Sequence, residues 1–436
     1  MKTNEYLYNM KNIDLNNYRC FTKLELDFKE NFNVLVGDNS SGKTTLIRAL
    51  SSVLNSFFIG YSDENTRFYG LSKNDFTIFE SQTGLANEEA IKINFNYLNV
   101  DAALELHSKK GRTLQKPLNP IYDLGREYFN NLFDENKNQV KDLPLFASFS
   151  TTDIHTTRKI SLTPFKNYEH KPSFGYYECL QGDGFLEYWT KRLLVLKEAG
   201  KGELEIKGVI NAVLDALGKS GCNIINDIQI RHNQSKIYYI LEDDREVPTE
   251  NLSDGYRRLL NIIIDIAFRC MILNKGIFGL DACYKTTGTV LIDEIDLHLH
   301  PTLQATVIKG LNIAFPKLQF ITTTHAPMVM TGIPIDDKNI IYKLNYNEYN
   351  GYSATPINLY GMDASSIIEI ALNTVPRSIE VDNRLTDLFN FIDEDKFPQA
   401  VEKLKIMKKE FGDNLPDLAK AEAMLNFLTE DNDNNK

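Results

Sequence analysis

Hydrophobic residues in this chain recur in short uninterrupted runs that end in small or charged residues. Residues 33–36 (Asn-Val-Leu-Val), 289–292 (Thr-Val-Leu-Ile) and 318–321 (Leu-Gln-Phe-Ile) are runs of this kind. Such runs are typical of buried strands. Residues 24–28 instead alternate between apolar and polar side chains, which predicts a half-buried strand. The pattern therefore predicts a sheet with both buried and half-exposed strands.

Other stretches have the spacing of amphipathic helices. Apolar residues recur at three- and four-residue steps from Leu46 to Phe57 and from Leu259 to Ala267. Further predicted helices are 122–133, 185–199, 206–217, 365–371, 384–392, 397–411 and 415–428. Further predicted strands are 91–97 and 340–344. We therefore predict an α/β protein with a mixed sheet, flanking helices and a C-terminal helical hairpin.

A phosphate-binding loop lies between the first buried run and the first helix. The residues are Gly37, Asp38, Asn39, Ser40, Ser41, Gly42, Lys43 and Thr44, followed by Thr45. They have the G-x-x-x-x-G-K-[ST] spacing, in which small residues let backbone N–H groups surround phosphates at the positive end of a helix. Lys43 is then placed to reach the β- and γ-phosphates of ATP, and the Thr44 hydroxyl to bind Mg²⁺.

The run at 289–292 ends in two acids, Asp293 and Glu294. Asp293 is expected to help hold Mg²⁺, and Glu294 to polarise the water that attacks ATP. Because neighbouring residues of a strand point to opposite sides, both acids reach one site only if Glu294 lies beyond the last pleat. The third run leads into His325, which is a candidate sensor of the γ-phosphate.

A serine turn completes the set. Leu252-Ser253-Asp254-Gly255 directly precedes the apolar helix that contains Leu259. Ser253 offers a hydroxyl and Gly255 permits close backbone approach, although a serine here could equally be an ordinary helix cap.

These motifs, in this order, resemble the ABC-type P-loop ATPases of the RecF, SMC and OLD-like group. Residues 13–21 resemble the N-terminal strand motif of that group. Residues 293–301 (Asp-Glu-Ile-Asp-Leu-His-Leu-His-Pro) and 324–327 (Thr-His-Ala-Pro) are more narrowly similar to the AAA-labelled ATPase subunits of bacterial anti-phage systems, notably Septu and retron-associated ATPases. Residues 143–147 and 360–363 share that narrower similarity.

The resemblance implies a shared catalytic site. Two heads would sandwich ATP in a homodimer or a higher even oligomer. Ser253 and Gly255 of one chain would complete the γ-phosphate site of the other, which is formed by Lys43, Thr44, Asp293, Glu294 and His325. A monomer would then be a poor ATPase. The family also places a glutamine on a strand after the phosphate loop, for which Gln82 and Asp75 are weak candidates here.

The spacing of the motifs suggests how the chain is divided. Residues 1–60 and 240–360 would form a discontinuous ATPase head, 61–239 an insertion, and 361–436 a C-terminal helical region. SMC-like relatives carry a coiled coil in the interval between the first two motifs, but no sustained heptads are present here. The insertion is therefore expected to be compact, with Trp189 packed in its core.

Charge and composition limit the partners. The chain has 436 residues, 42% of them hydrophobic, and a formal net charge of −11. This charge gives no support to nucleic-acid binding, which needs clustered Lys and Arg. The apolar stretch 259–273 is interrupted by charged residues and is too short for a membrane span. Five scattered cysteines predict neither disulfides nor a zinc site. We expect a cytoplasmic protein.

Three functions remain open. The leading hypothesis is a slow, dimerisation-dependent Mg²⁺-dependent ATPase that acts as sensor or regulatory scaffold of an anti-phage complex and controls a separate effector such as a nuclease. The alternative is a RecF- or SMC-like clamp in DNA repair or recombination, which would bind DNA in a salt-sensitive manner. A third is a module that holds ATP without hydrolysing it, which Glu294 argues against. A transporter head is disfavoured by the long interval between Lys43 and Ser253.

Overall fold

The computed structural model describes residues 9–77, 90–107, 111–151, 171–182, 184–349, 351–412 and 415–434. The chain divides into two compact units, Met1–Ile367 and Ile368–Lys436. The chain is an α/β protein, with parallel and antiparallel strands and flanking helices, which confirms the predicted fold class.

A six-stranded sheet forms the centre of the first unit. Its strand order is β13-β12-β3-β11-β10-β6, and all neighbouring strands are parallel except β12 and β13. The strands are β3 (Phe32–Val36), β6 (Leu145–Phe149), β10 (Gly288–Ile292), β11 (Leu318–Thr323), β12 (Ile340–Asn347) and β13 (Gly351–Ile357). Every residue of β3, β6, β10 and β11 is buried, as the apolar runs in three of them predicted. Parallel strands share one carboxyl edge, and the candidate site lies there.

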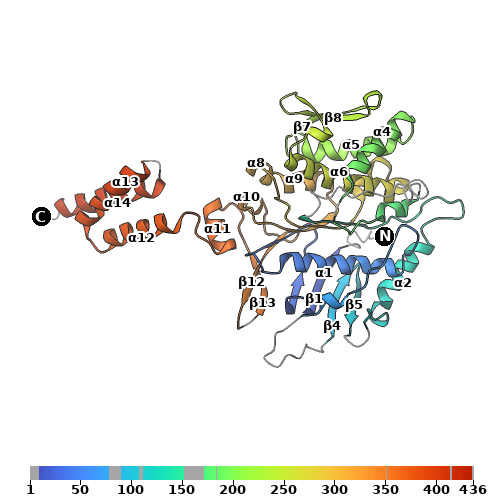
Figure 1. The fold of residues 1–436 in the computed structure, drawn as a ribbon, viewed down its shortest axis with the longest axis horizontal. Coiled ribbons are helices and arrows are strands. Elements are labelled where there is room, and N and C mark those ends of the chain that lie inside the picture. Colours follow the sequence, from blue (N-terminus) through green and yellow to red (C-terminus); the bar gives the residue numbers. More distant parts are fainter. Residues whose placement is uncertain are drawn as a thin grey trace. The chain divides into compact units, whose positions relative to one another are not determined.

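A second, antiparallel sheet covers one side of the first helix. It has the order β2-β1-β4-β5, formed by β1 (Met10–Tyr18), β2 (Phe21–Asp27), β4 (Ile91–Tyr97) and β5 (Val100–Leu106). Helix α1 (Lys43–Asn55) contacts β4 on one side and β10 and β11 on the other, so it lies between the two sheets (Figure 1). Buried residues on several sides of α1 fit this position.

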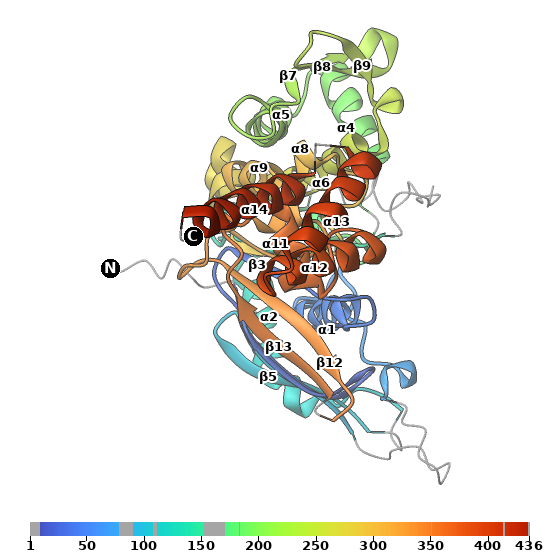
Figure 2. The ribbon, with the colours of Figure 1, turned by 90° about the vertical axis from the view of Figure 1, so that its left-hand side faces the viewer.

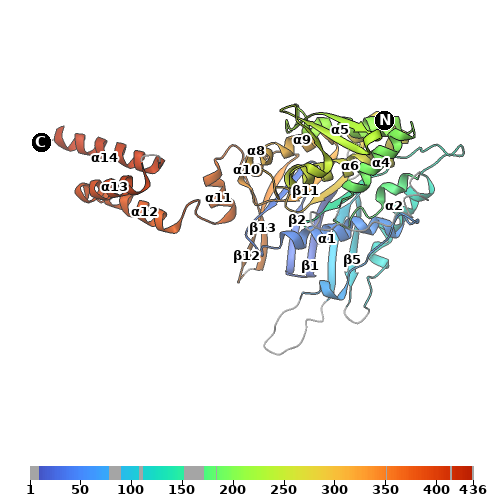
Figure 3. The same cartoon turned by 45° about the horizontal axis from the view of Figure 1, so that its top comes forward.

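The other face of the central sheet is covered by helices. The longest is α6 (Asp254–Phe278), which packs against β6, α4 (Leu186–Glu198) and α5 (Glu203–Leu217) (Figure 3). A three-stranded sheet of β7 (Ile225–Arg231), β8 (Lys236–Leu241) and β9 (Glu246–Pro248) lies next to α4 and α5 (Figure 2). Trp189 is 2% exposed, stacks on Phe268 and donates from Nε1 to Asp265 Oδ1 at 2.7 Å. Its predicted core position is confirmed.

Several shorter elements complete the first unit. The helices are α2 (Asn119–Asn130), α7 (Ala282–Lys285), α8 (Pro301–Gln304), α9 (Val307–Ala314), α10 (Pro327–Met330) and α11 (Ala364–Leu372), the last of which crosses the boundary between the units. The sequence predicted one strand after His325, and this was wrong. Strand β13 pairs with β12 along residues 351–357, but its alternating burial is weak because it is an edge strand with polar side chains.

The proposed division of the chain has one structural complication. Strand β6 falls inside the segment 61–239 yet belongs to the central sheet, where it is the edge strand next to β10. The head and the insertion are therefore interleaved, and their boundaries remain a proposal. Among the described residues, none of the helices has the length and hydrophobicity that a bilayer crossing requires.

The second unit is a small helical bundle. It contains α12 (Ile379–Asp393), α13 (Phe397–Phe411) and α14 (Pro416–Asn434), so the predicted hairpin of the last two helices is joined by a third. The three helices share a core, whose buried members are Leu385, Leu388, Ile392, Ala400, Leu404, Met407, Leu418, Ala421 and Leu425. Ion pairs Arg384–Glu410 and Lys408–Glu422 cross between neighbouring helices.

Candidate nucleotide site

The phosphate loop connects the end of β3 to the start of α1. The loop residues Asp38, Asn39 and Ser40 are exposed, while Lys43 is 7% exposed. The Lys43 ammonium donates to the carbonyl oxygens of Gly37 and Asp38, both at 2.9 Å, and to Ser41 Oγ at 3.4 Å. Burial lowers the pKa of Lys43, and this effect outweighs the nearby acids, of which Asp293 contributes most. The lysine is thus held inside a loop whose outer rim is open.

A corner between β1 and β2 closes one side of the loop. Gly42 has φ 92°, and a Cβ there would lie 2.5 Å from the Phe21 ring and 3.3 Å from Cys20 Sγ. Glycine is required at this position because a side chain would be both strained and blocked. Tyr352 of β13 packs edge-on against Phe21. Residues 13–21 therefore lie directly against the loop that they precede.

Asp293 connects the loop to the central sheet. Its side chain is 3% exposed and accepts two hydrogen bonds, from Thr44 Oγ1 to Oδ2 at 2.9 Å and from Thr323 Oγ1 to Oδ1 at 2.7 Å. Its backbone N–H donates to the Phe149 carbonyl at 2.8 Å. The start of α1 and the ends of β10, β11 and β6 thus meet at one acid, as expected for the shared carboxyl edge of parallel strands.

Glu294 lies beyond the last pleat of β10, as the sequence required. Strand β10 ends at Ile292, and Glu294 has φ 51° in the left-handed region. Its N–H donates to Thr323 Oγ1 at 2.7 Å, and its carbonyl accepts from Arg258 Nη2 at 3.0 Å. The sharp turn points the Glu294 side chain away from the direction that a continued strand would give it.

His325 follows the neighbouring strand tip. A second acid, Asp296, accepts from Thr324 Oγ1 at 2.6 Å and from the His325 backbone N–H at 3.4 Å. Burial lowers the pKa of His325, and the Lys43 charge lowers it further, against the opposing effect of Asp296, Glu294 and Asp293. At neutral pH the imidazole is therefore uncharged and can donate one N–H.

The serine turn lies at the start of α6. Ser253 is exposed and accepts from the Tyr256 N–H at 3.4 Å, so it is the N-cap of the helix. Gly255 is buried, and a Cβ there would be 2.4 Å from the His298 carbonyl oxygen. Hydrogen bonds through Asp293 and the Thr323 hydroxyl bring Thr44, Asp293 and Glu294 together, and Lys43 is next to Thr44 in the chain. The hydrogen bonds of the described residues attach Ser253 only to its own helix. Ser253 is therefore exposed to solvent, as are Asp38, Asn39, Ser40 and Thr44 of the loop.

Sequence reasoning missed three residues that shape the site: Thr323, Asp296 and Arg258. Thr323 and Asp296 have a signal, since both follow buried runs and stand next to predicted site residues. Arg258 has a weaker one, a charged residue inside an apolar helical pattern. It is 4% exposed and bonds three backbone carbonyls.

Asp75, one of the two candidates for the family's strand glutamine, forms its hydrogen bonds away from the acid tip. Gln82 lies outside the described residues. The Asp75 carboxylate pairs with Arg19 at 2.6 Å and accepts from the Ser72 N–H at 2.8 Å. The strand beside β10 is β6, and Phe149 and Ser150 at its end are the residues that contact Asp293 and Arg258.

The residues present fit a magnesium ion. Thr44 Oγ1 and Asp293 Oδ2 already lie within hydrogen-bond distance of each other, at 2.9 Å, and both are hard oxygen ligands of the type that Mg²⁺ binds together with phosphates. His298 and His300 do not join this cluster. His300 instead accepts from the Thr302 N–H at 3.4 Å and caps the short helix α8.

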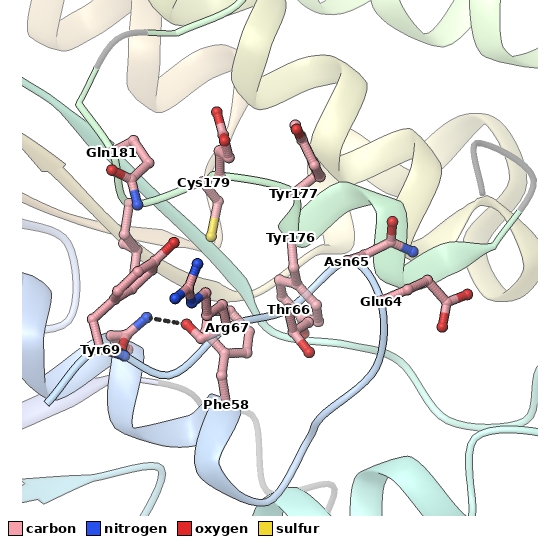
Figure 4. Close-up of a pocket in the computed structure, with 13 residues that line it drawn as sticks. Phe58, Glu64, Asn65, Thr66, Arg67, Tyr69, Tyr176, Tyr177, Cys179 and Gln181 are labelled. Carbon is pink, nitrogen blue, oxygen red and sulfur yellow. Dashed lines mark hydrogen bonds between the residues drawn. The ribbon is translucent and has the colours of Figure 1, made fainter. Parts of the chain in front are cut away.

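A separate pocket of about 250 Å³ lies between the segment after α1 and residues 176–181 (Figure 4). Its lining includes Arg67, Tyr69, Cys179 and Gln181 and contains none of the predicted site residues. Burial raises the pKa of Cys179 to about 12, so the thiol stays protonated and weakly nucleophilic.

The sequence matches known proteins over these regions. Residues 10–174, which contain the phosphate loop, match the AAA ATPase domain family. The chain is 26% identical to the Retron Vc95 probable ATPase of Vibrio cholerae serotype O1 biovar El Tor, covering 85% of this chain and 81% of that protein. It is also 26% identical to the Retron Ec83 probable ATPase of Escherichia coli, covering 84% and 77%.

The chain is thus similar to P-loop ATPases, among them the retron ATPases over most of its length and RecF proteins over a short segment. Septu protein PtuA of Bacillus thuringiensis is 23% identical to this ATPase over 75% of the chain and 74% of its own length. The SMC head domain from Thermotoga maritima covers 80% of the ATPase and 99% of that structure, with a TM-score of 0.38 and 13% identity. The resemblance drawn from residues 13–21, 37–44 and 293–301 is confirmed.

Proposed function

We propose that this protein is the Mg²⁺-dependent ATP-hydrolysing subunit of a bacterial anti-phage complex, where it acts as sensor or regulatory scaffold for a separate effector. The observation that carries the proposal is the cluster of Lys43, Thr44, Asp293 and Glu294 at one sheet edge. Similarity to the retron and Septu ATPases over most of the chain supports the biological setting. ATP would reach this site in the cytoplasm.

In this proposal the loop binds ATP and the strand tip hydrolyses it. The backbone N–H groups of residues 38–45 surround the phosphates, and Lys43 turns from its loop carbonyls toward the β- and γ-phosphate oxygens. Thr44 and Asp293 would hold Mg²⁺, which supplies positive charge to the phosphates when bound. The Glu294 carboxylate accepts a proton from the attacking water, and neutral His325 donates to the γ-phosphate.

Hydrolysis is proposed to need two chains. Ser253 is exposed at the start of α6, where a hydroxyl and the helix N-terminus can both face an anion. The same chain's Lys43 uses acceptors from its own loop. A second head docked on the open rim would supply Ser253 and Gly255 to the γ-phosphate, giving a symmetric dimer with two shared sites. Turnover by an isolated chain would then be slow.

The effector is proposed to be a separate protein, such as a nuclease or a toxin. Among the described residues, no group of three or more His, Cys, Asp or Glu side chains is arranged to hold a metal. The helical bundle of α12 to α14 has its own core and offers a second folded unit for a partner.

The proposal is tested by an ATPase assay on the purified protein and by a phage-infection assay in cells. Purified protein should release phosphate from ATP only with Mg²⁺, and Glu294→Gln should stop this release. In cells that carry the native gene neighbourhood, the parental protein should lower phage plating efficiency and Glu294→Gln should not. If the purified protein degraded nucleic acid unaided in Mg²⁺ or Mn²⁺, the separate-effector proposal would be wrong.

A second candidate is a DNA-repair clamp, favoured by matches to RecF proteins. The RecF protein of Exiguobacterium is 51% identical, but over only 9% of this chain. A net charge of −11 opposes binding to a polyanion. ATP-strengthened DNA binding that weakens steeply with salt would favour this candidate.

A further inference from the structure

Arg258 joins the start of α6 to the backbone that follows strands β6 and β10. It lies in the second turn of α6 and is 4% exposed. Its Nη2 donates to the carbonyl oxygens of Asp293 at 2.8 Å and Glu294 at 3.0 Å. Its Nη1 donates to the Ser150 carbonyl at 3.4 Å, just past β6. One guanidinium therefore binds three backbone carbonyls from two segments that are distant from it and from each other in sequence.

The carbonyls it binds are those that define the turn at Glu294. A non-glycine residue in the left-handed region costs about 1–2 kcal/mol, so the surrounding structure must hold Glu294 there. Two groups do so from opposite sides of the peptide: Thr323 Oγ1 accepts the Glu294 N–H, and Arg258 donates to the carbonyls before and after it. The direction of the Glu294 carboxylate depends on this turn.

The same helix end also carries the exposed serine turn. Ser253 and Arg258 are five residues apart on one helix, roughly 8 Å along its axis. Gly255, between them, packs against the His298 carbonyl with no room for a Cβ. The start of α6 therefore contacts the His298 backbone through Gly255 and the strand tip at Glu294 through Arg258. A displacement of the helix start must move the Glu294 backbone or break its hydrogen bonds.

We propose that Arg258 is a positioning residue that fixes the catalytic orientation of Glu294 and links it to the serine turn of the same chain. The inference rests on the proposed function and deepens it. Docking of a second head on Ser253 would change the position of Glu294, the water-activating acid of that same chain, through Arg258. We expect binding of ATP to the loop to be independent of Arg258, because the carbonyls that the guanidinium binds belong to residues 150, 293 and 294 at the strand ends.

The test is Arg258→Lys, with Arg257→Lys as the matched control. Lysine keeps the positive charge but, as a point donor, cannot bind three carbonyls in a fixed plane. Arg257 is exposed and lies next to it. We expect Arg258→Lys to lower kcat about 10- to 100-fold while its Kd for ATP stays within about 3-fold of the parental value. Arg257→Lys should change neither.

A merely structural arginine would give a different pattern. It would lower the melting temperature and weaken ATP binding together with kcat, and it would add its loss of turnover to that of Glu294→Gln. If Arg258 acts through Glu294, the double variant Arg258→Lys, Glu294→Gln should be no slower than Glu294→Gln alone. Additive losses, or unchanged kcat in Arg258→Lys, would overturn the inference.

Hydrogen exchange separates this inference from the proposed function. Peptides that cover residues 292–297 should exchange faster in Arg258→Lys than in the parental protein, while peptides from α1 and β3 stay protected. This readout needs no ATP turnover. If the parental protein hydrolysed no ATP, the proposed function would fail, and the exchange of 292–297 would still decide whether Arg258 holds the tip. Unchanged hydrogen exchange in residues 292–297 would refute the proposed role of Arg258.

Discussion

The two halves of the candidate site are built in opposite ways. The phosphate loop is local: Lys43 finds its acceptors at Gly37, Asp38 and Ser41, all within six residues. The acidic tip is assembled from distant segments, since Asp293 and Glu294 depend on partners from α1, β6, β11 and α6. The hydrogen bonds of Lys43 thus form within one short segment, whereas those of the tip form only when the strands of the sheet and α6 have come together.

This difference predicts that substitutions in the loop and substitutions at the tip impair different steps. Changes in the loop should remove nucleotide binding and leave the fold intact. Changes at the tip should spare binding and remove turnover, and changes in its supports should also cost stability. The predictions below test that separation in order of decreasing effect.

Glu294→Gln should give the largest effect. Glutamine keeps the shape of the side chain but cannot accept a proton from water, so kcat should fall by about 10²- to 10⁴-fold with unchanged ATP affinity. Single-turnover phosphate release measures this, and sedimentation with ATP should show an accumulated dimer. Glu250→Gln, at an exposed position, is the control. Parental turnover in Glu294→Gln would refute the assignment of the base.

Lys43→Ala should abolish binding at working ATP concentrations. Loss of a nearly buried cation from the phosphates is expected to weaken Kd by about 100-fold or more, near 3 kcal/mol. Titration calorimetry measures the affinity, with exposed Lys23→Ala as the control. Tight binding by Lys43→Ala would show that the loop does not hold the phosphates.

Thr323→Val should weaken the tip and the fold together. The Thr323 hydroxyl is fully buried, donates to Asp293 and accepts from the Glu294 N–H. Its loss leaves both partners unsatisfied and should lower the free energy of unfolding by about 1–3 kcal/mol. Urea unfolding measures this, with exposed Thr302→Val as the control. A change below about 0.5 kcal/mol would mean that the two bonds are dispensable.

The smallest effect concerns pH. Burial lowers the pKa of His325 in the folded state below the unfolded value near 6.5, so the unfolded state binds more protons between those two values. The stability from the neutral imidazole is complete above about pH 6.5 and is lost as pH falls through that window. His325→Gln should therefore lose less stability than the parental protein between pH 7 and pH 5 in thermal unfolding. Equal losses would contradict the pKa shift.

The same contrast explains what could be predicted from sequence. The loop, the apolar strands and the position of Glu294 beyond its strand follow from short-range patterns. Strands β13 and β7 were missed because their mixed polarity gives weak periodicity, whereas the central strand β8 was missed although its burial alternates. Arg258 was missed because its partners at 150, 293 and 294 become neighbours only through the sheet order β10-β6. Residues whose partners are close in sequence could therefore be predicted, and residues whose partners are distant in sequence could not.

The central claim is that ATP held by the loop of one chain is hydrolysed with the serine turn of another, and a mixing experiment tests it most directly. Lys43→Ala and Ser253→Arg chains should each be nearly inactive alone, yet an equal mixture should regain up to about one quarter of parental ATPase activity, because half of the dimers would contain one intact site. An activity of the mixture no greater than the sum of its two components would contradict the claim.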